Sequence, residues 1–273
     1  MEKGLEKVKI FFSGCLMGVS DALPGISGAT IALILDIYEK LIKSISYFFS
    51  NIFHPLKLIR SKEFKFLINL YAGVLIALLL SLGIIGGLLH KYEVAVFSFF
   101  IGLILASIWI IFRRNSGEVL KNIHYLFVGA LGGYLLFGVG LIASSHEMGI
   151  VFIAGFLAIS AMILPGISGS YILLMMGQYE FIARSVVEIN LVPLLMLSIG
   201  MIGGLFVMSK LLRKLLRDYH GQTMVFLIGL MIGGLRAPLT RIWTGASLGE
   251  ITKIIMAAGI GAVLILAIDR AGK

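Results

Sequence analysis

Six apolar blocks, each long enough to cross a lipid bilayer, restrict what this sequence can fold into. A hydrocarbon core about 30 Å thick is crossed by about 20 helical residues. The blocks run over 67–89, 94–112, 123–143, 191–209, 223–240 and 251–268. Because 59% of the residues are hydrophobic and only 14% are charged, the chain has too little polar surface for a soluble domain. The sequence therefore predicts an all-α polytopic membrane protein.

Two further apolar stretches, 8–38 and 149–179, are too long for one ordinary span and too short for two. Each is broken near its middle by the same hexapeptide, Leu-Pro-Gly-Ile-Ser-Gly, at 23–28 and at 164–169. Proline removes a backbone donor and glycine loosens a helix, so one helix should end there and another begin. The arms would pass the midplane without crossing, which predicts two re-entrant helical hairpins. One long kinked span through each break is the alternative.

The distribution of Lys and Arg decides between these alternatives. If each hairpin enters and leaves by one face and the six blocks cross, 18 of the 23 basic residues lie on the first face. Basic residues concentrate in cytoplasmic loops, so both termini are expected in the cytoplasm. This orientation signal accounts for the net charge of +9, and no nucleic-acid partner is predicted.

The hexapeptide belongs to a longer internal match. Residues 20–42 align with 161–183 at an offset of 141, IGGLL at 85–89 matches IGGLF at 202–206, and FIGL at 100–103 matches LIGL at 227–230. Matches in the same order indicate a duplication, with repeats at 1–145 and 146–273. Each repeat would hold one hairpin and three crossing helices. Because three is odd, the second repeat should be inverted, as in many secondary transporters.

The first repeat carries an additional segment, 43–66, that mixes aromatic residues with Lys and Arg. Such a composition is typical of a segment lying on the membrane surface, where basic side chains attract anionic lipid head groups. We expect this segment at the cytoplasmic interface.

A helix that begins after each Pro-Gly pair would place unpaired N–H groups near the middle of the membrane. Helix starts also carry the positive end of the helix dipole. Two starts converging from opposite faces would suit a phosphate or a carboxylate. The alternative is that glycine only permits close packing and serine caps its own helix. The candidate binding residues at the hairpin tips are Ser27, Gly28, Thr30, Ser168, Gly169 and Ser170.

Three carboxylates within or beside the apolar segments are candidates for proton coupling. Asp21 precedes the first hexapeptide and could carry a proton or pair with a basic group. Glu39 and Glu180 follow the two hairpins on opposite faces. Proton coupling and simple solvation at the interface both remain open for this pair.

Three arginines are candidates for phosphate binding. Arg236 lies within GLRAPLTR near the outer interface, where it could face inward and bind an anionic head group or extend outward to the interface. Arg114 and Arg241 follow the matched FIGL and LIGL segments on opposite faces. They could load phosphate or anchor the helix ends.

Catalytic and metal-binding signatures are not found in the sequence. His146 and Glu147 lack the second histidine of the zinc-protease motif, and no phosphate-binding loop or Ser-His-Asp grouping is present. A single cysteine, Cys15, and five scattered histidines give no disulfide or metal-ligand pattern. The sequence favours a transporter over an enzyme and predicts no cofactor.

The segments SDALPGISGAT, LPGISGSYILLMMGQY and GLRAPL resemble the prokaryotic polyprenyl-phosphate transporter family over essentially the whole chain. The resemblance implies a flippase that returns undecaprenyl phosphate, or another polyprenyl phosphate, from the outer to the cytoplasmic leaflet of the cell membrane. The carrier lipid would then be reused in cell-envelope glycan synthesis. Proton coupling is a further expectation, and the oligomeric state is not predicted.

The residues alone indicate only an anion site between inverted repeats. A secondary transporter for a small soluble anion would fit that site too. A membrane enzyme acting on lipid phosphates is disfavoured, since the catalytic grouping it would need is missing.

Overall fold

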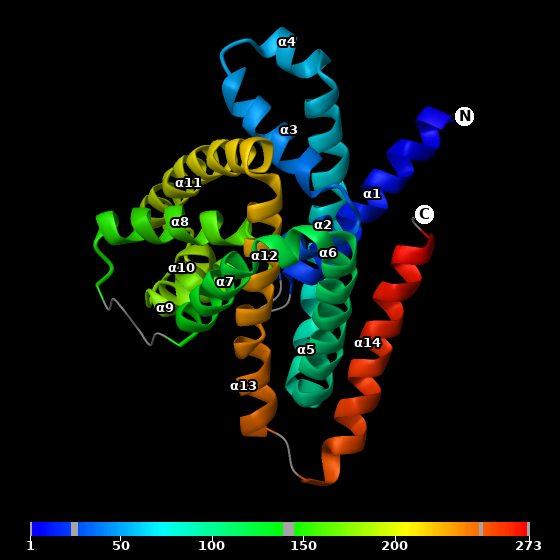
Figure 1. The fold of residues 1–273 in the computed structure, drawn as a ribbon. Coiled ribbons are helices and arrows are strands. Elements are labelled where there is room, and N and C mark those ends of the chain that lie inside the picture. Colours follow the sequence, from blue (N-terminus) through cyan, green and yellow to red (C-terminus); the bar gives the residue numbers. More distant parts are fainter. Residues whose placement is uncertain (1, 23–26, 139–144, 246–247, 272–273) are drawn as a thin grey trace.

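The computed structural model describes residues 2–22, 27–138, 145–245 and 248–271, and its regular elements over these ranges are helices (Figure 1). Within them, five helical segments are long and apolar enough to cross a membrane: Lys62–Ser81, Lys91–Arg114, Leu191–Asp218, His220–Thr244 and Ile251–Arg270. The protein is therefore a helical, multi-pass membrane protein, as the apolar blocks predict.

The described part of the chain is divided into fourteen α-helices and one short 3₁₀ helix. In the first half these are α1 (Glu2–Asp21), α2 (Gly28–Ile34), α3 (Tyr38–Ser50), α4 (Pro55–Arg60), α5 (Lys62–Arg114), α6 (Ser116–Lys121) and α7 (Ile123–Leu136). In the second half they are α8 (Met148–Met162), α9 (Gly169–Met175), α10 (Tyr179–Val187), α11 (Leu191–Asp218), α12 (His220–Gly234), α13 (Arg236–Gly245), η1 (Leu248–Glu250) and α14 (Ile251–Ala271).

Helix α5 contains the expected spans 67–89 and 94–112 without a loop between them. The two parts are divided at Tyr92, whose φ of −135° and ψ of 38° are not helical. The single expected span 223–240 is formed by α12 and α13, which together make one segment of 25 residues, His220–Thr244.

The expected span 123–143 is shorter than predicted. Helix α7 has 14 residues, or about 21 Å of helix, and residues 139–143 of the expected span lie outside the described residues. At the end of α7, backbone carbonyl oxygens accept hydrogen bonds from side chains of other helices, where a longer helix would bond them to its own N–H groups. Arg236 donates to the carbonyl oxygen of Tyr134, and Tyr171 donates to that of Phe137. The end of α7 is therefore set by contacts that its own sequence does not contain.

Each expected hairpin has a second arm of only seven residues, α2 or α9, packed against the preceding α1 or α8. The arm is shorter than the sequence predicts because Asp36 and Gly177, at equivalent positions, adopt positive φ angles of 56° and 64°. The N–H of the following residue then bonds back to Ala32 or Leu173. This arrangement ends a helix and turns the chain away from its axis.

Two helix pairs that hold the hairpins in place are built in the same way. Helix α1 packs on the first part of α5, with Gly14 facing Gly73, and α8 packs on α11, with Gly155 facing Gly200. A Cβ atom at any of the four would collide with the carbonyl oxygen three residues before the facing glycine. Both pairs are thus backbone-to-backbone contacts, the close approach that small residues allow between membrane helices.

Two further helix pairs join the halves of the chain. The second part of α5 packs on α14, where Gly102 faces Gly261, and α7 packs on α12, where Gly129 faces Gly229. Each half therefore contributes its last long helix to the other half. The four glycine contacts form two matched sets, and the division of the chain into two repeats stays a prediction.

The facing glycines give an offset between the two halves. Gly73 corresponds to Gly200 and Gly102 to Gly229, both at an offset of 127. The FIGL and LIGL segments have this offset, whereas the IGGLL and IGGLF segments differ by 117. The side chains of residues 85–89 lie outside the described part of the chain, so the match between IGGLL and IGGLF stays a prediction.

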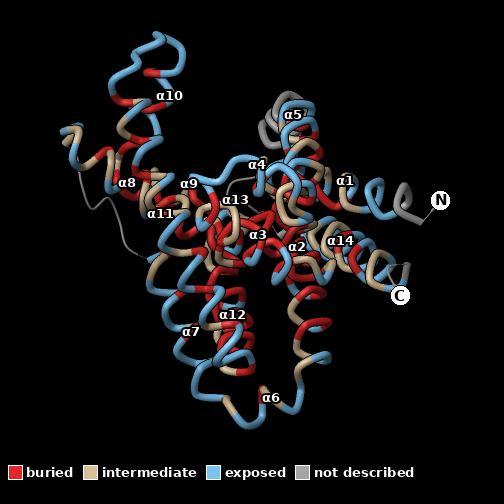
Figure 2. Tube along the Cα trace, turned by 90° about the horizontal axis from the view of Figure 1, so that it is seen from above, coloured by how far each residue is buried: buried red, intermediate tan, exposed pale blue. Residues whose placement is uncertain are grey.

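Buried residues gather where α2, α3 and α12 meet, at the centre of the molecule (Figure 2). Every residue of α2 is buried. By contrast, α7, α11 and α14 carry many exposed Leu, Ile and Val side chains, as expected of surfaces that face lipid. In the segment 43–66, Phe53 is 92% exposed next to the basic helix α4, which fits a place at the membrane surface; that placement stays a prediction.

Candidate functional site

Within the described residues, the two hairpins are joined by three hydrogen bonds. The hydroxyl of Ser27 donates to the carbonyl oxygen of Met162 at 2.9 Å, and the hydroxyl of Thr30 accepts from the N–H of Gly166 at 3.1 Å. The hydroxyl of Tyr38 donates to the carbonyl oxygen of Ile163 at 3.1 Å. The structure thus brings the duplicated motifs together, and it uses Ser27 and Thr30 to do so.

The start of α2 is occupied by a carboxylate of the protein itself. The N–H of Gly28 donates to Asp21 at 2.6 Å, and the N–H of Ala29 donates to the Ser27 hydroxyl at 3.2 Å. A Cβ atom on Gly28 would lie 2.6 Å from the Asp21 carboxylate, so glycine is required for this contact. In the present conformation, an external anion would have to displace Asp21 to reach these donors.

The start of α9 is arranged differently. Ser168 makes no capping hydrogen bond to its own helix, and its hydroxyl lies 2.7 Å from that of Ser170. Gly169 packs against the backbone of Ala158. The position equivalent to Asp21 is Met162, so the second hairpin lacks the carboxylate that occupies the first.

Two arginines lie beside the second hairpin. The guanidinium of Arg236 donates to the carbonyl oxygen of Tyr134 at 2.8 Å and lies 4.1 Å from the centre of the Tyr134 ring. Arg241 lies 3.9 Å from Glu93, and the side chains of this pair are 60% and 48% exposed. Tyr171 of α9 donates to the carbonyl oxygen of Phe137 at 3.0 Å, three residues after Tyr134. We call Tyr134, Tyr171, Arg236 and Arg241 the Arg241 site.

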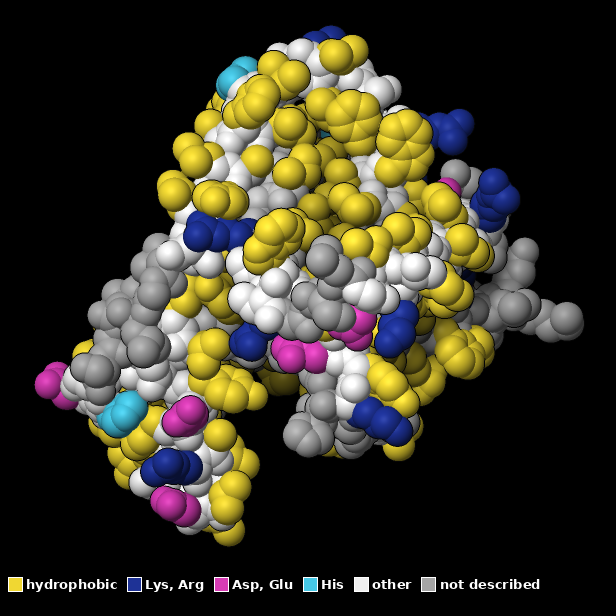
Figure 3. Space-filling model, turned by 90° about the horizontal axis from the view of Figure 1, so that it is seen from below, with side chains coloured by type: hydrophobic (Ala, Val, Ile, Leu, Met, Phe, Trp, Pro, Cys, Tyr) yellow, Lys and Arg dark blue, Asp and Glu magenta, His cyan; other side chains and the backbone are white. Residues whose placement is uncertain are grey.

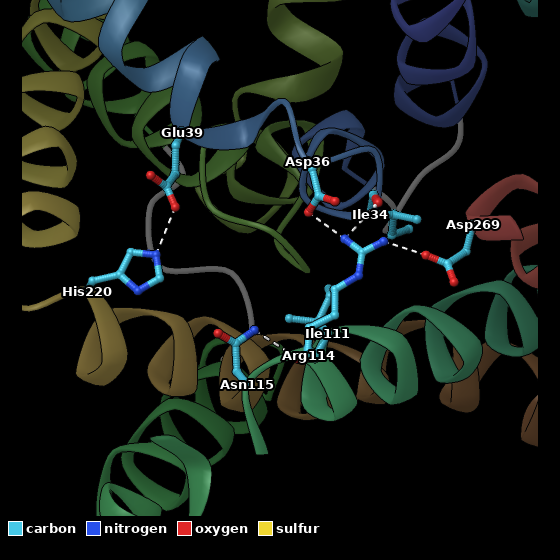
Figure 4. Close-up of polar contacts among 8 residues, drawn as sticks. All are labelled: Ile34, Asp36, Glu39, Ile111, Arg114, Asn115, His220 and Asp269. Atoms are coloured by element: carbon cyan, nitrogen blue, oxygen red, sulfur yellow. Dashed lines mark hydrogen bonds and ion pairs between the residues drawn. The ribbon is translucent and has the colours of Figure 1, made fainter. Parts of the chain in front are cut away.

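Arg114, the equivalent of Arg241, lies between two carboxylates. One nitrogen of its guanidinium donates to Asp36 and, at 3.3 Å, to the carbonyl oxygen of Ile34, while another donates to Asp269 (Figure 4). Asp36 follows α2, Arg114 ends α5 and Asp269 lies near the end of α14. The arginine therefore links the first hairpin, the second part of α5 and the last helix of the other half.

A polar cavity and an apolar cavity meet next to Arg114. The polar cavity, of about 220 Å³, is lined by Arg114, Asp36 and Asp269 together with Lys9, Lys40 and Glu6. The apolar cavity, of about 100 Å³, lies between α1, α2, α5 and α14, and both are lined by Ile34, Leu35 and Ile268. We call the Arg114 ion pairs and these two cavities the Arg114 site.

The Arg114 site and the Arg241 site lie at opposite ends of one membrane-length helix. Glu93, the partner of Arg241, begins the second part of α5, and Arg114 ends it. Twenty-one residues of helix separate the two, which corresponds to about 30 Å, the thickness of a bilayer core. Figure 3 shows the face that contains the lower ends of α13 and α14, with acidic and basic side chains at its centre and hydrophobic side chains around them.

The structure does not place the three candidate proton carriers in one group. Glu39, at the start of α3, lies 2.8 Å from Nε2 of His220 at the start of α12 (Figure 4). Glu180 is exposed in the first turn of α10, and Asp21 is at the hairpin tip. Over the described ranges, no group of three or more His, Cys, Asp or Glu side chains is arranged to hold a metal ion.

Comparison with known proteins decides the family. A family model described as undecaprenyl phosphate translocase-like matches residues 17–254. The chain belongs to the undecaprenyl phosphate translocase-like family. A polyprenyl-phosphate transporter of Vibrio cholerae serotype O1 is 35% identical over 250 residues, which cover 88% of this chain and 79% of the relative. One of Staphylococcus aureus is 31% identical over 264 residues, which cover 90% and 91%. No solved structure matches the chain significantly.

For this member of the translocase-like family, the sequence alone indicated Arg114 but missed the residues around it. Asp36 and Asp269 pair with Arg114, and Lys9 and Lys40 line the same cavity. One signal was available for Asp269, since a carboxylate near the end of an apolar segment requires a partner. Asp36 gave no such signal, because its position follows from the backbone turn that ends α2.

Proposed function

We propose that this protein moves a polyprenyl phosphate between the leaflets of the cell membrane, from the outer to the cytoplasmic leaflet, for reuse in cell-envelope glycan synthesis. Its relatives in Vibrio cholerae and Staphylococcus aureus are named polyprenyl-phosphate transporters. The observation that carries the proposal is the pair of cavities at the Arg114 site, where a polar cavity with charged side chains of both signs joins an apolar one.

The two cavities match the two parts of such a lipid. A phosphate group loses its hydration when it enters the membrane, and the guanidinium of Arg114 can replace water with two parallel hydrogen bonds. The isoprenoid chain requires only an apolar surface, which Ile34, Leu35 and Ile268 supply before the chain passes into lipid. A small soluble anion would leave the apolar cavity without a role.

We further propose that the halves are inverted repeats that rock around the joined hairpin tips. The second part of α5 and the span formed by α12 and α13 are equivalent helices, and their directions support this proposal. Arg241 near the end of α13 contacts Glu93 at the start of the second part of α5, so these helices run in opposite directions. In this arrangement Arg114 faces the cytoplasm, Arg241 and Arg236 face the outside, and both termini are cytoplasmic. Ser27 and Thr30 hold the tips together and Gly28 donates to Asp21 within the first hairpin, while Ser168, Gly169 and Ser170 lie beside the path of the head group.

Proton coupling is included in the proposal, with Asp21, Glu39 and Glu180 as carriers. Glu39 contacts His220, so two side chains that can carry protons connect the end of the first hairpin to α12. Transport measured with and without an imposed proton gradient tests this part. The Asp21→Asn, Glu39→Gln and Glu180→Gln variants, each compared with the unmodified protein, identify a carrier by loss of the response to the gradient.

The transport proposal is tested with purified protein in lipid vesicles that contain a polyprenyl monophosphate in both leaflets. A phosphatase added outside removes only the head groups that reach the outer leaflet. The protein should make the inner-leaflet fraction accessible, and Arg114→Gln should slow this exchange. Uptake of radioactive inorganic phosphate without lipid exchange would instead identify a small-anion transporter, and phosphate release without added phosphatase would identify an enzyme.

A further inference from the structure

The cavity at Arg114 contains as many acidic as basic side chains. Lys9, Lys40 and Arg114 face Glu6, Asp36 and Asp269. Lys40 lies 3.4 Å from Glu6, and Arg114 pairs with both aspartates. Lys9 has no ion pair within the described part of the chain. A phosphate monoester with a charge of about −2 therefore enters a cavity whose strongest donor is already occupied.

The positions equivalent to Asp36 and Asp269 in the opposite halves carry no carboxylate. Asp36 corresponds to Gly177 at the offset of 141. The facing glycines of α7 and α14 set an offset of 132, so Asp269 corresponds to Phe137. Arg241 itself has an exposed contact with Glu93 at 3.9 Å, a distance too long for a hydrogen bond. The two arginines thus match in position and differ in their partners.

The two aspartates differ in their contact with solvent. The side chain of Asp269 is 11% exposed and that of Asp36 is 74% exposed, while that of Arg114 is 27% exposed. Water screens the Asp36 pair more than the Asp269 pair. Asp269 is therefore the stronger competitor for the guanidinium, and Asp36 is the easier to displace.

Resting on the proposed function, we infer that Asp36 and Asp269 compete with the substrate phosphate for Arg114. The Arg114 site then binds a phosphate monoester only as these carboxylates withdraw, and it has a lower affinity for phosphate than the Arg241 site. The carboxylates return as the phosphate departs, which speeds release. This difference sets the affinity at each end of the path and does not by itself drive net transport, because an uncoupled carrier moves lipid down its gradient.

The test measures binding of geranyl monophosphate, a short soluble polyprenyl phosphate, to purified protein by calorimetry. Arg241→Gln isolates the Arg114 site, and Arg114→Gln isolates the Arg241 site. In the Arg241→Gln protein, adding Asp269→Asn should lower the Kd about tenfold, which corresponds to about 1.4 kcal/mol. In the Arg114→Gln protein the same change should leave the Kd unaltered. Asp218→Asn, which removes an exposed partner of Arg217, is the matched control in both backgrounds.

Asp36→Asn supplies a second variant that should fold, because asparagine tolerates positive φ and the side chain is largely exposed. It should lower the Kd at the Arg114 site by a smaller factor than Asp269→Asn. Geraniol, which lacks the phosphate, should show no dependence on either aspartate.

Four results would overturn the inference. The first three are equal affinities of the two sites, an unchanged Kd in both aspartate variants, and an equal fall in Kd in both backgrounds. The fourth is that the Arg241→Gln protein with Asp269→Asn binds geranyl monophosphate no more tightly than geraniol. The vesicle assay separates this failure from that of the proposed function. If the unmodified protein exchanges lipid and the aspartate variants have no effect, the proposed transport function stands and the proposed competition is rejected. If the unmodified protein exchanges no lipid, the transport function itself is rejected.

Discussion

At the scale of single residues, identical serines of the duplicated motif have different surroundings. Ser27 caps α2 and bonds to Met162 of the other hairpin, whereas Ser168 pairs with Ser170. The difference begins one turn earlier, where Asp21 of the first hairpin corresponds to Met162 of the second. Sequence identity within a repeat therefore does not imply identical contacts.

These surroundings predict different costs of removing the two hydroxyl groups. Ser27→Ala should lower the free energy of unfolding by about 1–2 kcal/mol, because a helix cap and a hydrogen bond between the hairpins are lost. Ser168→Ala should cost clearly less, since no cap is lost. Denaturant unfolding of the purified variants in one detergent gives the comparison, and equal losses would contradict the contacts described.

The residue types at the hairpin tips could be predicted from sequence, but their partners could not. Pro, Gly and Ser in one hexapeptide indicate a helix break and a helix start, because these properties are local. The bond between Thr30 and Gly166 and the pairing of Arg114 with Asp269 depend on how distant helices pack. The position of Arg241, by contrast, could be predicted from the sequence, because Arg241 repeats Arg114 along the chain.

At the scale of helices, facing glycines fix the distance between partners. The length of the long spans follows from composition, and for this reason five of the six expected crossings have sufficient length. The end of α7 is the exception. It depends on Arg236 and Tyr171 from α13 and α9, which hydropathy along α7 does not contain.

Two glycines on α14 provide a matched test of this packing. Gly261 faces the backbone of α5, whereas a Cβ at Gly259 would meet open space. Gly261→Leu should destabilise the protein by about 1–3 kcal/mol or more, because the backbone contact cannot yield. Gly259→Leu should be neutral or slightly stabilising, since leucine favours helix. Thermal unfolding in detergent measures both, and similar midpoints would argue against close contact of α5 with α14.

At the scale of the whole molecule, the proposed orientation places the Arg114 site on the cytoplasmic side and the Arg241 site outside, at opposite ends of the second part of α5. The number of Lys and Arg residues in each loop predicted this orientation without any contact information. Helix α1 begins and α14 ends on the same side of the molecule in the ribbon of Figure 1 and in the trace of Figure 2; the cytoplasmic location of both termini stays a prediction. The repeat boundaries stay a prediction supported by the matched glycine pairs.

Cysteine labelling tests the orientation. In a Cys15→Ser background, Lys253→Cys should react with a membrane-impermeant maleimide in right-side-out vesicles, because this exposed residue begins α14 at the outer end. Lys121→Cys, equally exposed in α6, should react only after the vesicles are opened with detergent. Labelling of both cysteines in sealed vesicles, or of Lys121→Cys alone, would reverse or exclude the orientation.

The exchange of long helices between the halves also has a consequence for biosynthesis. The second part of α5 emerges early from the ribosome, but its partner α14 is made last. Until then Gly102 has no facing helix and Arg114 has only one of its two aspartates. The first half must therefore stay in the membrane without its full set of helix contacts until α14 is inserted. A chain truncated before α14 should be recognised by quality-control proteases through this defect in its first half.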